Sequence, residues 1–113
     1  MGQLYEVNKD TFENDVLKAS KPVLIEFGAV WCAPCKVLEP IMEELAAEWG
    51  DDILVAKIDV DDAVDIAGGY QIFSVPTTIL FKDGEPLERF VGVQPKHRMN
   101  DKVQEHLQAT KAD

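Results

Sequence analysis

A strand–helix–strand pattern in the first half of the chain is the feature that most limits how it can fold. Residues 23–27 form a short, nearly continuous apolar run, which is typical of a strand buried on both faces. From Cys32 to Gly50, apolar side chains recur every three or four residues, as in an amphipathic helix. Residues 53–58 form a second apolar run. Two buried strands joined by a helix pair in parallel through a right-handed crossover, so the pattern predicts an α/β fold.

The remaining segments predict further helices and an antiparallel hairpin. They are a helix beginning at Asp10, a short helix over 59–65 ended by Gly68-Gly69, strands over 77–81 and 87–91, and a helix beginning near Pro95. Asp10 and Glu13 have the spacing of a capping box. Asp83-Gly84, between the last two strands, is a strong hairpin signal. Together the segments predict a mixed sheet with helices on both faces.

Length and charge exclude several classes of function. A chain of 113 residues suits one hydrophobic core, so we expect a single domain over 1–113. Eleven basic and twenty-one acidic residues give a net charge of −10, which repels phosphates, so we expect neither nucleic acid nor a membrane as partner. No apolar run approaches the roughly 18 residues that span a bilayer. The N-terminus lacks the apolar stretch of a secretory signal, so we expect a cytoplasmic location.

The two cysteines, Cys32 and Cys35, lie where the first buried strand meets the long helix. They can be read as two small buried apolar residues, or as half of a zinc site. The only other soft ligands, His97 and His106, are nine residues apart on the predicted last helix and therefore point to opposite sides. We therefore expect no metal site, and we expect both histidines to be solvated.

Redox chemistry fits the Cys-x-x-Cys spacing better than either alternative. Cys32 begins a helix, where free N–H groups and the helix dipole stabilise a thiolate, the form that attacks a disulfide. Cys35 lies three residues later on nearly the same face, so its sulfur can reach Cys32 and resolve a mixed disulfide. Pro34 stiffens the first helical turn without removing a needed hydrogen bond.

Six segments together resemble the thioredoxin family over about the whole chain. They are Trp31-Cys-Ala-Pro-Cys-Lys36, Pro22-Val-Leu-Ile-Glu-Phe27, Val55-Ala-Lys-Ile-Asp59, Ser74-Val-Pro-Thr77, Phe81-Lys-Asp-Gly84 and Val91-Gly92. The resemblance implies a thioredoxin fold, with a central five-stranded mixed β-sheet flanked by four α-helices. It also implies reduction of disulfide-containing protein substrates, re-reduction by a thioredoxin reductase, and no bound cofactor beyond a redox-active Cys32–Cys35 disulfide.

The resemblance also assigns roles to individual residues. Cys32 corresponds to the attacking thiol, Cys35 to the buried resolving thiol, and Pro76 to a cis-proline that lies against the disulfide. An ordinary trans proline at the start of a strand is the alternative for Pro76. The expected substrate-binding rim consists of Trp31, Ala33, Pro34, Val75, Val91, Gly92 and Val93. Some of these could instead belong to the core or to a β-bulge. Because this rim is the only apolar surface expected, we predict a monomer.

Glu26 interrupts the first buried strand, where a carboxylate must either find a cation or keep its proton. Lys57, in the adjacent predicted strand, is the expected partner, and a purely structural ion pair is the alternative. The family typically has Asp here, accepting the proton of the resolving cysteine through water. The resemblance therefore implies that Glu26 deprotonates Cys35, with Lys57 tuning it.

Two other positions depart from the family pattern. Ala33 stands where Gly is usual and adds a methyl group to the docking surface. Gly28 replaces a larger side chain, so we expect looser packing around the active-site loop.

Three functions follow from these residues. The leading prediction is a general disulfide reductase, because Pro34 resembles reducing members. A disulfide oxidase or isomerase, in which His usually stands between the cysteines, is the first alternative. The second is a non-catalytic binding subunit.

Overall fold

A five-stranded mixed sheet forms the centre of the computed structural model, which describes residues 2–112 and their side chains through residue 108. The strands are β1 (Tyr5–Val7), β2 (Val23–Gly28), β3 (Leu54–Asp59), β4 (Thr77–Lys82) and β5 (Glu85–Val91). Their order across the sheet is β1-β3-β2-β4-β5. Strand β3 pairs in parallel with β1 and β2, whereas β4 is antiparallel to β2 and β5. The predicted parallel unit and hairpin are therefore confirmed.

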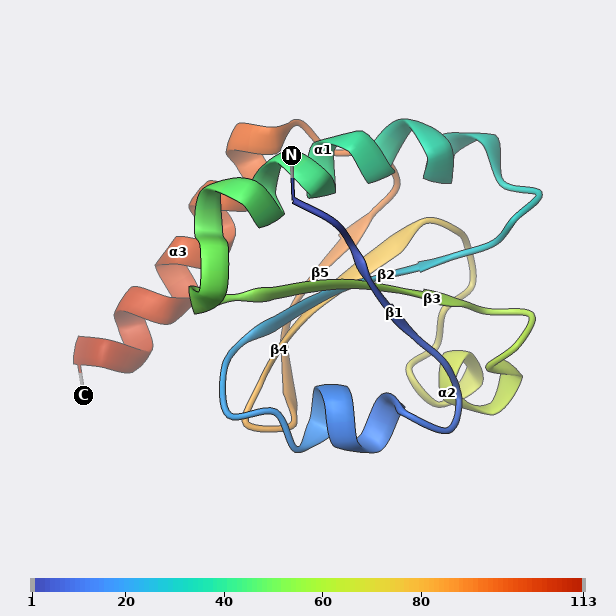
Figure 1. Ribbon diagram of the computed structural model, residues 1–113, viewed down its shortest axis with the longest axis horizontal. Coiled ribbons are helices and arrows are strands. Elements are labelled where there is room, and N and C mark those ends of the chain that lie inside the picture. Colours follow the sequence, from blue (N-terminus) through green and yellow to red (C-terminus); the bar gives the residue numbers. More distant parts are fainter. Residues whose placement is uncertain (1, 113) are drawn as a thin grey trace.

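Four helices cover the two faces of the sheet (Figure 1). They are η1 (Glu13–Leu17), α1 (Ala33–Trp49), α2 (Val64–Gly69) and α3 (Lys96–Ala112), and a short 3-10 turn, η2 (Gly50–Asp52), follows α1. Helices α1 and α3 pack on one face, over a core that includes Leu24 and Leu80. Helix η1 packs on the opposite face over Ile25 and Phe81. Side chains of alternate β2 residues thus pack into two separate cores on opposite faces of the sheet, which explains why the apolar run is nearly continuous.

The apolar pattern of the sequence does not predict strand β1, although the family resemblance implies a fifth strand. It has only three residues, and both Tyr5 and Glu6 are exposed while Val7 is buried. An edge strand this short shows neither an apolar run nor a sustained alternation.

The first and third predicted helices along the chain begin at other residues than expected. The first helix, η1, begins after Phe12, which makes no side-chain capping hydrogen bond, so Asp10 is not its cap. Asn8 instead orders the turn before η1, because its Oδ1 accepts hydrogen bonds from the backbone N–H groups of Asp10 (2.8 Å) and Thr11 (3.0 Å). The predicted helix over 59–65 starts only at Val64, because the residues after Asp59 form a turn. Gly68 and Gly69 are its last residues rather than a break beyond it.

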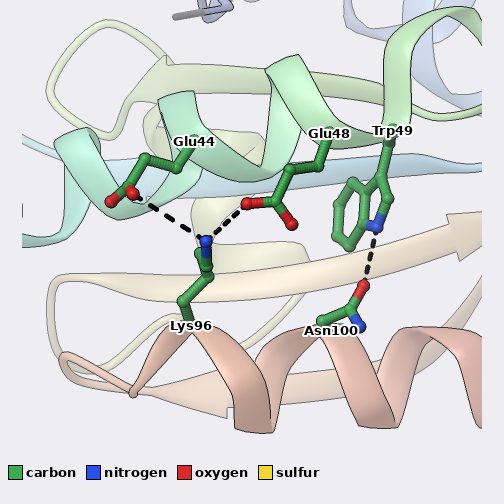
Figure 2. A network of polar contacts seen from close by, with 5 residues as sticks. All are labelled: Glu44, Glu48, Trp49, Lys96 and Asn100. Carbon is green, nitrogen blue, oxygen red and sulfur yellow. Dashed lines mark hydrogen bonds and ion pairs between the residues drawn. The ribbon is translucent and has the colours of Figure 1, made fainter.

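Polar contacts join α1 to α3 on the face of the sheet that both helices cover (Figure 2). Lys96 at the start of α3 lies between Glu44 (3.8 Å) and Glu48 of α1. The indole N–H of Trp49 donates to Asn100 Oδ1 at 2.8 Å. These contacts fix the far end of α1, whose first turn carries the two cysteines.

Candidate active site

Cys32 and Cys35 are joined by a disulfide across the first turn of α1. Strand β2 ends at Gly28, and a tight turn follows in which Cys32 N–H donates to the Ala29 carbonyl (3.2 Å). Cys32 is the N-cap residue of α1, and its Sγ accepts a hydrogen bond from Cys35 N–H at 3.2 Å. This contact is the one that would stabilise a Cys32 thiolate after reduction.

The two sulfur atoms have different surroundings. Cys32 is 3% exposed and Cys35 is fully buried. An ideal Cβ built on Gly28 would lie 3.2 Å from Cys35 Sγ and 3.3 Å from Glu26 Cδ. Gly28 therefore does not loosen the packing as expected from the sequence. Instead, the absence of a side chain there leaves room for both the Cys35 sulfur and the Glu26 carboxyl group next to Gly28.

Glu26 is 1% exposed, and its Oε2 has no hydrogen-bond partner among the described residues. Burial is the main reason that the pKa of Glu26 rises from 4.5 to about 8, and the nearby Glu39 carboxylate raises this pKa further. The Lys57 and Lys36 ammonium groups act in the opposite direction without cancelling the rise. The Glu26 carboxyl group is therefore mostly protonated at neutral pH while the disulfide is closed.

Lys57 acts on Glu26 electrostatically and lowers its pKa, but its ion pairs are with other carboxylates. The two residues are aligned in the β2–β3 register, so they face the same side of the sheet. However, Lys57 Nζ lies 3.6 Å from Glu39 and 3.9 Å from Glu6. Both of these carboxylates retain contact with solvent, so pairing with them desolvates the ammonium group less than entering the site of Glu26.

A cavity of about 160 Å³ connects these groups. Its charged lining consists of Glu6, Glu26, Lys36, Glu39, Lys57 and Asp59. The cavity borders Gly28, whose Cα carries no side chain between Cys35 Sγ and the Glu26 carboxyl group. Cys35 does not itself line the cavity, so Gly28 and Glu26 are the residues that link its sulfur to this space.

The loop before β4 has the cis peptide bond that the family resemblance implied. The Val75–Pro76 bond is cis, and Pro76 is buried while Val75 is half-buried. Val75 packs against the cluster that contains both cysteines. The Pro76 carbonyl accepts a hydrogen bond from Gly92 N–H at 2.8 Å, and Gly92 has a φ of +80°, a conformation that favours glycine.

The remaining residues of the expected rim lie at the surface. Trp31 (67% exposed), Ala33, Pro34, Val91 and Val93 are exposed, and Gly92 is half-buried. None of these exposed side chains belongs to the three buried clusters, so the alternative that they are core residues is not supported.

Two residues near the rim escaped the sequence analysis. Asp61 accepts a hydrogen bond from the Trp31 indole N–H at 2.8 Å, which holds this exposed ring. Phe73, two residues before Val75, is 89% exposed. Asp61 belongs to a run of acidic residues and Phe73 lies in a loop, and neither setting indicates from the sequence that the residue lies near the rim.

The structure gives no support for a metal centre. Among residues 2–112, no three His, Cys, Asp or Glu side chains are placed to hold a metal ion. His97 is exposed as expected, but His106 is half-buried and its Nε2 lies 3.0 Å from Glu88 Oε1, so the prediction of a solvated His106 is wrong. No helix within the described part of the chain is long and apolar enough to cross a bilayer.

A disulfide at the start of a helix, next to a buried carboxyl group and a cis-proline loop, defines a thiol–disulfide oxidoreductase. The thioredoxin family model matches residues 3–105. The chain is 53% identical over 92 residues to a thioredoxin of Mycolicibacterium smegmatis, a match that covers 80% of this chain and 82% of that protein. It is 48% identical over 91 residues to a thioredoxin of Mycobacterium tuberculosis, covering 80% and 78%.

A third relative joins two activities in one chain. The bifunctional thioredoxin reductase/thioredoxin of Mycobacterium leprae is 45% identical over 95 residues, which cover 84% of this chain and 21% of that protein.

The chain belongs to the thioredoxin family. It is a protein-disulfide reductase whose redox centre is the Cys32–Cys35 disulfide. Of the functions left open by the sequence, disulfide reduction is the one that the family supports.

Proposed function

We propose that Cys32 is the attacking thiolate, that Cys35 resolves the mixed disulfide, and that Glu26 accepts the Cys35 proton. The hydrogen bond from Cys35 N–H to Cys32 Sγ is the observation that carries this assignment. It lies at a helix N-terminus, where it stabilises negative charge on the Cys32 sulfur. The Cys35 sulfur, in contrast, is fully buried and faces Gly28 and the Glu26 carboxyl group.

The reaction runs in two displacements. The Cys32 thiolate attacks one sulfur of the substrate disulfide, which forms a mixed disulfide and releases one substrate thiolate. Glu26 releases its own proton to solvent through the cavity that it lines, and the resulting carboxylate accepts the proton of Cys35. The Cys35 thiolate then attacks the Cys32 sulfur. The second substrate thiolate leaves, the Cys32–Cys35 disulfide closes, and the substrate has gained two electrons.

The substrate-binding rim is proposed to receive an extended peptide that pairs with the Val75 backbone like an added strand. The cis bond at Pro76 and the half-buried Val75 beside the disulfide support this docking mode. Trp31, Pro34, Val91, Gly92 and Val93 would contact the same peptide. The exposed Ala33 methyl group would narrow the choice of substrate relative to a glycine at this position.

A thioredoxin reductase is the proposed electron donor that reopens the disulfide. The fused relative supports this partner, because reductase and thioredoxin occur there in one chain. We further propose a cytoplasmic monomer, since a reducing compartment keeps such a dithiol in its active form.

The direct test is reduction of insulin with a thioredoxin reductase and its nicotinamide donor. The wild-type chain should turn over repeatedly, and Cys32→Ser should abolish turnover. Glu26→Gln should flatten the pH dependence of the rate near neutrality. An unchanged pH profile in Glu26→Gln would remove Glu26 from the mechanism, and full activity of Cys32→Ser would overturn the assignment of the attacking thiol.

A further inference from the structure

Glu39 lies beside the redox site but belongs to none of the motifs that define it. It follows Cys35 by four residues on α1, so both side chains lie on the same face of the helix. Its side chain is 24% exposed and lines the cavity that contains Glu26. A carboxylate at this position is therefore close enough to act on Glu26 and is still partly hydrated.

Lys57 has three carboxyl groups within reach, and its position shows which of them it pairs with. In the β2–β3 register it is aligned with Glu26, the arrangement that would favour pairing within the sheet. Its Nζ instead lies 3.6 Å from Glu39 and 3.9 Å from Glu6. The Glu6 side chain is 82% exposed, so solvent screens that pair more strongly than the pair with Glu39.

The charges facing Glu26 come from three elements. Helix α1 contributes Lys36 and Glu39, β3 contributes Lys57 and Asp59, and β1 contributes Glu6. On the β4 side, the aligned residue is Thr78, which is uncharged and fully buried. Of the acidic groups, Glu39 acts most strongly on Glu26.

We propose that Glu39 is a positioning residue for the proton transfer at Cys35, because it draws the Lys57 ammonium group to the α1 side of the cavity and away from Glu26. This inference rests on the proposed function of Glu26 and deepens it. With Lys57 held by Glu39, the Glu26 carboxylate stays basic enough to take a proton from a thiol. If Lys57 paired with Glu26 directly, the carboxylate would be a much weaker acceptor of the Cys35 proton, and proton transfer to it would be further uphill.

The proton affinities of the two groups show why this matters. An ordinary thiol has a pKa of about 8.5. An ordinary glutamate carboxyl group has a pKa of 4.5, so transfer between them would be strongly uphill. Burial and Glu39 bring the pKa of Glu26 to about 8, which makes the transfer nearly balanced.

The test is a titration of Glu26 in the oxidised protein, followed through the side-chain carboxyl carbon of ¹³C-labelled glutamate. Loss of the resonance in Glu26→Gln assigns it. In Glu39→Gln the titration midpoint of Glu26 should fall by about one unit, and the pH at which the rate of mixed-disulfide resolution is half-maximal should fall by the same amount. Glu43→Gln, which removes one charge from the same helix outside the cavity lining, should change neither.

A second pair of variants isolates the part played by Lys57. In a Lys57→Met background, Glu39→Gln should move the Glu26 midpoint by less than half as much, because only the direct repulsion between the two carboxylates remains. An equal shift in both backgrounds would overturn the proposed capture of Lys57. An unmoved midpoint in Glu39→Gln would overturn the role of Glu39 while leaving Glu26 in the mechanism. An unchanged pH profile in Glu26→Gln would instead remove the proposed function itself.

Discussion

A buried carboxyl group makes the stability of the oxidised protein depend on pH. The pKa of Glu26 is about 8 in the folded protein against an ordinary value of 4.5, so the folded state binds this proton more tightly than the unfolded chain does. The resulting stabilisation is complete below about pH 4.5 and is lost as the pH rises through about 8.

We therefore predict that wild-type protein loses about 3 to 5 kcal/mol of unfolding free energy relative to Glu26→Gln between pH 4.5 and pH 8. Urea unfolding of both oxidised proteins across this range measures the difference. Parallel pH curves for the two proteins would show that Glu26 is ionised in the folded state.

A second prediction for single residues concerns Trp31, whose exposed ring is held by one hydrogen bond to Asp61. Asp61→Ala removes the acceptor of the Trp31 indole N–H, so the ring is no longer held in one position before a substrate binds. Fixing the ring then costs conformational entropy at the binding step. The KM for a protein disulfide should rise about two- to ten-fold, with little change in kcat. Steady-state reduction of insulin measures both constants.

Asp65→Ala is the matched control, since it also removes an exposed negative charge from this region. An equal rise in KM for the two variants would assign the effect to charge and not to Trp31.

At the scale of elements, two kinds of contact hold α1 against α3, and they should differ in strength (Figure 2). Trp49 is buried and donates its indole N–H to Asn100, whereas Lys96 and Glu48 are exposed enough for solvent to screen their ion pair. A double-mutant cycle of Trp49→Phe with Asn100→Ala should give a coupling energy of about 1 kcal/mol.

The corresponding cycle of Lys96→Met with Glu48→Gln should give less than about 0.5 kcal/mol, and this value should fall as salt is added. Unfolding free energies at low and high salt measure both cycles. A coupling energy for the Lys96 pair that exceeds that of the Trp49 pair would contradict the expected order of the two contacts.

At the scale of the whole molecule, the sequence predicts those helices and strands in which apolar side chains recur regularly over many positions. Residues 23–27 and the helix after Cys32 repeat apolar side chains over enough positions to indicate both their type and their buried face. Strand β1 has three residues with one buried side chain, so its place in the sheet follows from pairing with β3 and not from its own pattern. The turn before η1 likewise depends on Asn8, whose hydrogen bonds to Asp10 and Thr11 exist only in the folded chain.

The site shows the same division between local and long-range information. The cysteine pair, the proline before β4 and a carboxylate inside an apolar strand are visible in the sequence. The partners of these residues are not. Lys57 pairs with Glu39 because α1 lies across β3, and Trp31 bonds to Asp61 because two loops meet. Such choices depend on competition among several charged groups in three dimensions, which spacing along the chain does not encode.

The most direct measurement traps the covalent intermediate of disulfide reduction. Reduced Cys35→Ser and reduced Cys32→Ser are each mixed with a disulfide-bonded protein, and the adducts are identified by mass spectrometry. Cys35→Ser should accumulate a stable adduct through Cys32, and Cys32→Ser should form almost none. Comparable trapping through Cys35 would contradict the proposed roles, because the buried sulfur beside Glu26 would then be an attacking thiol as well.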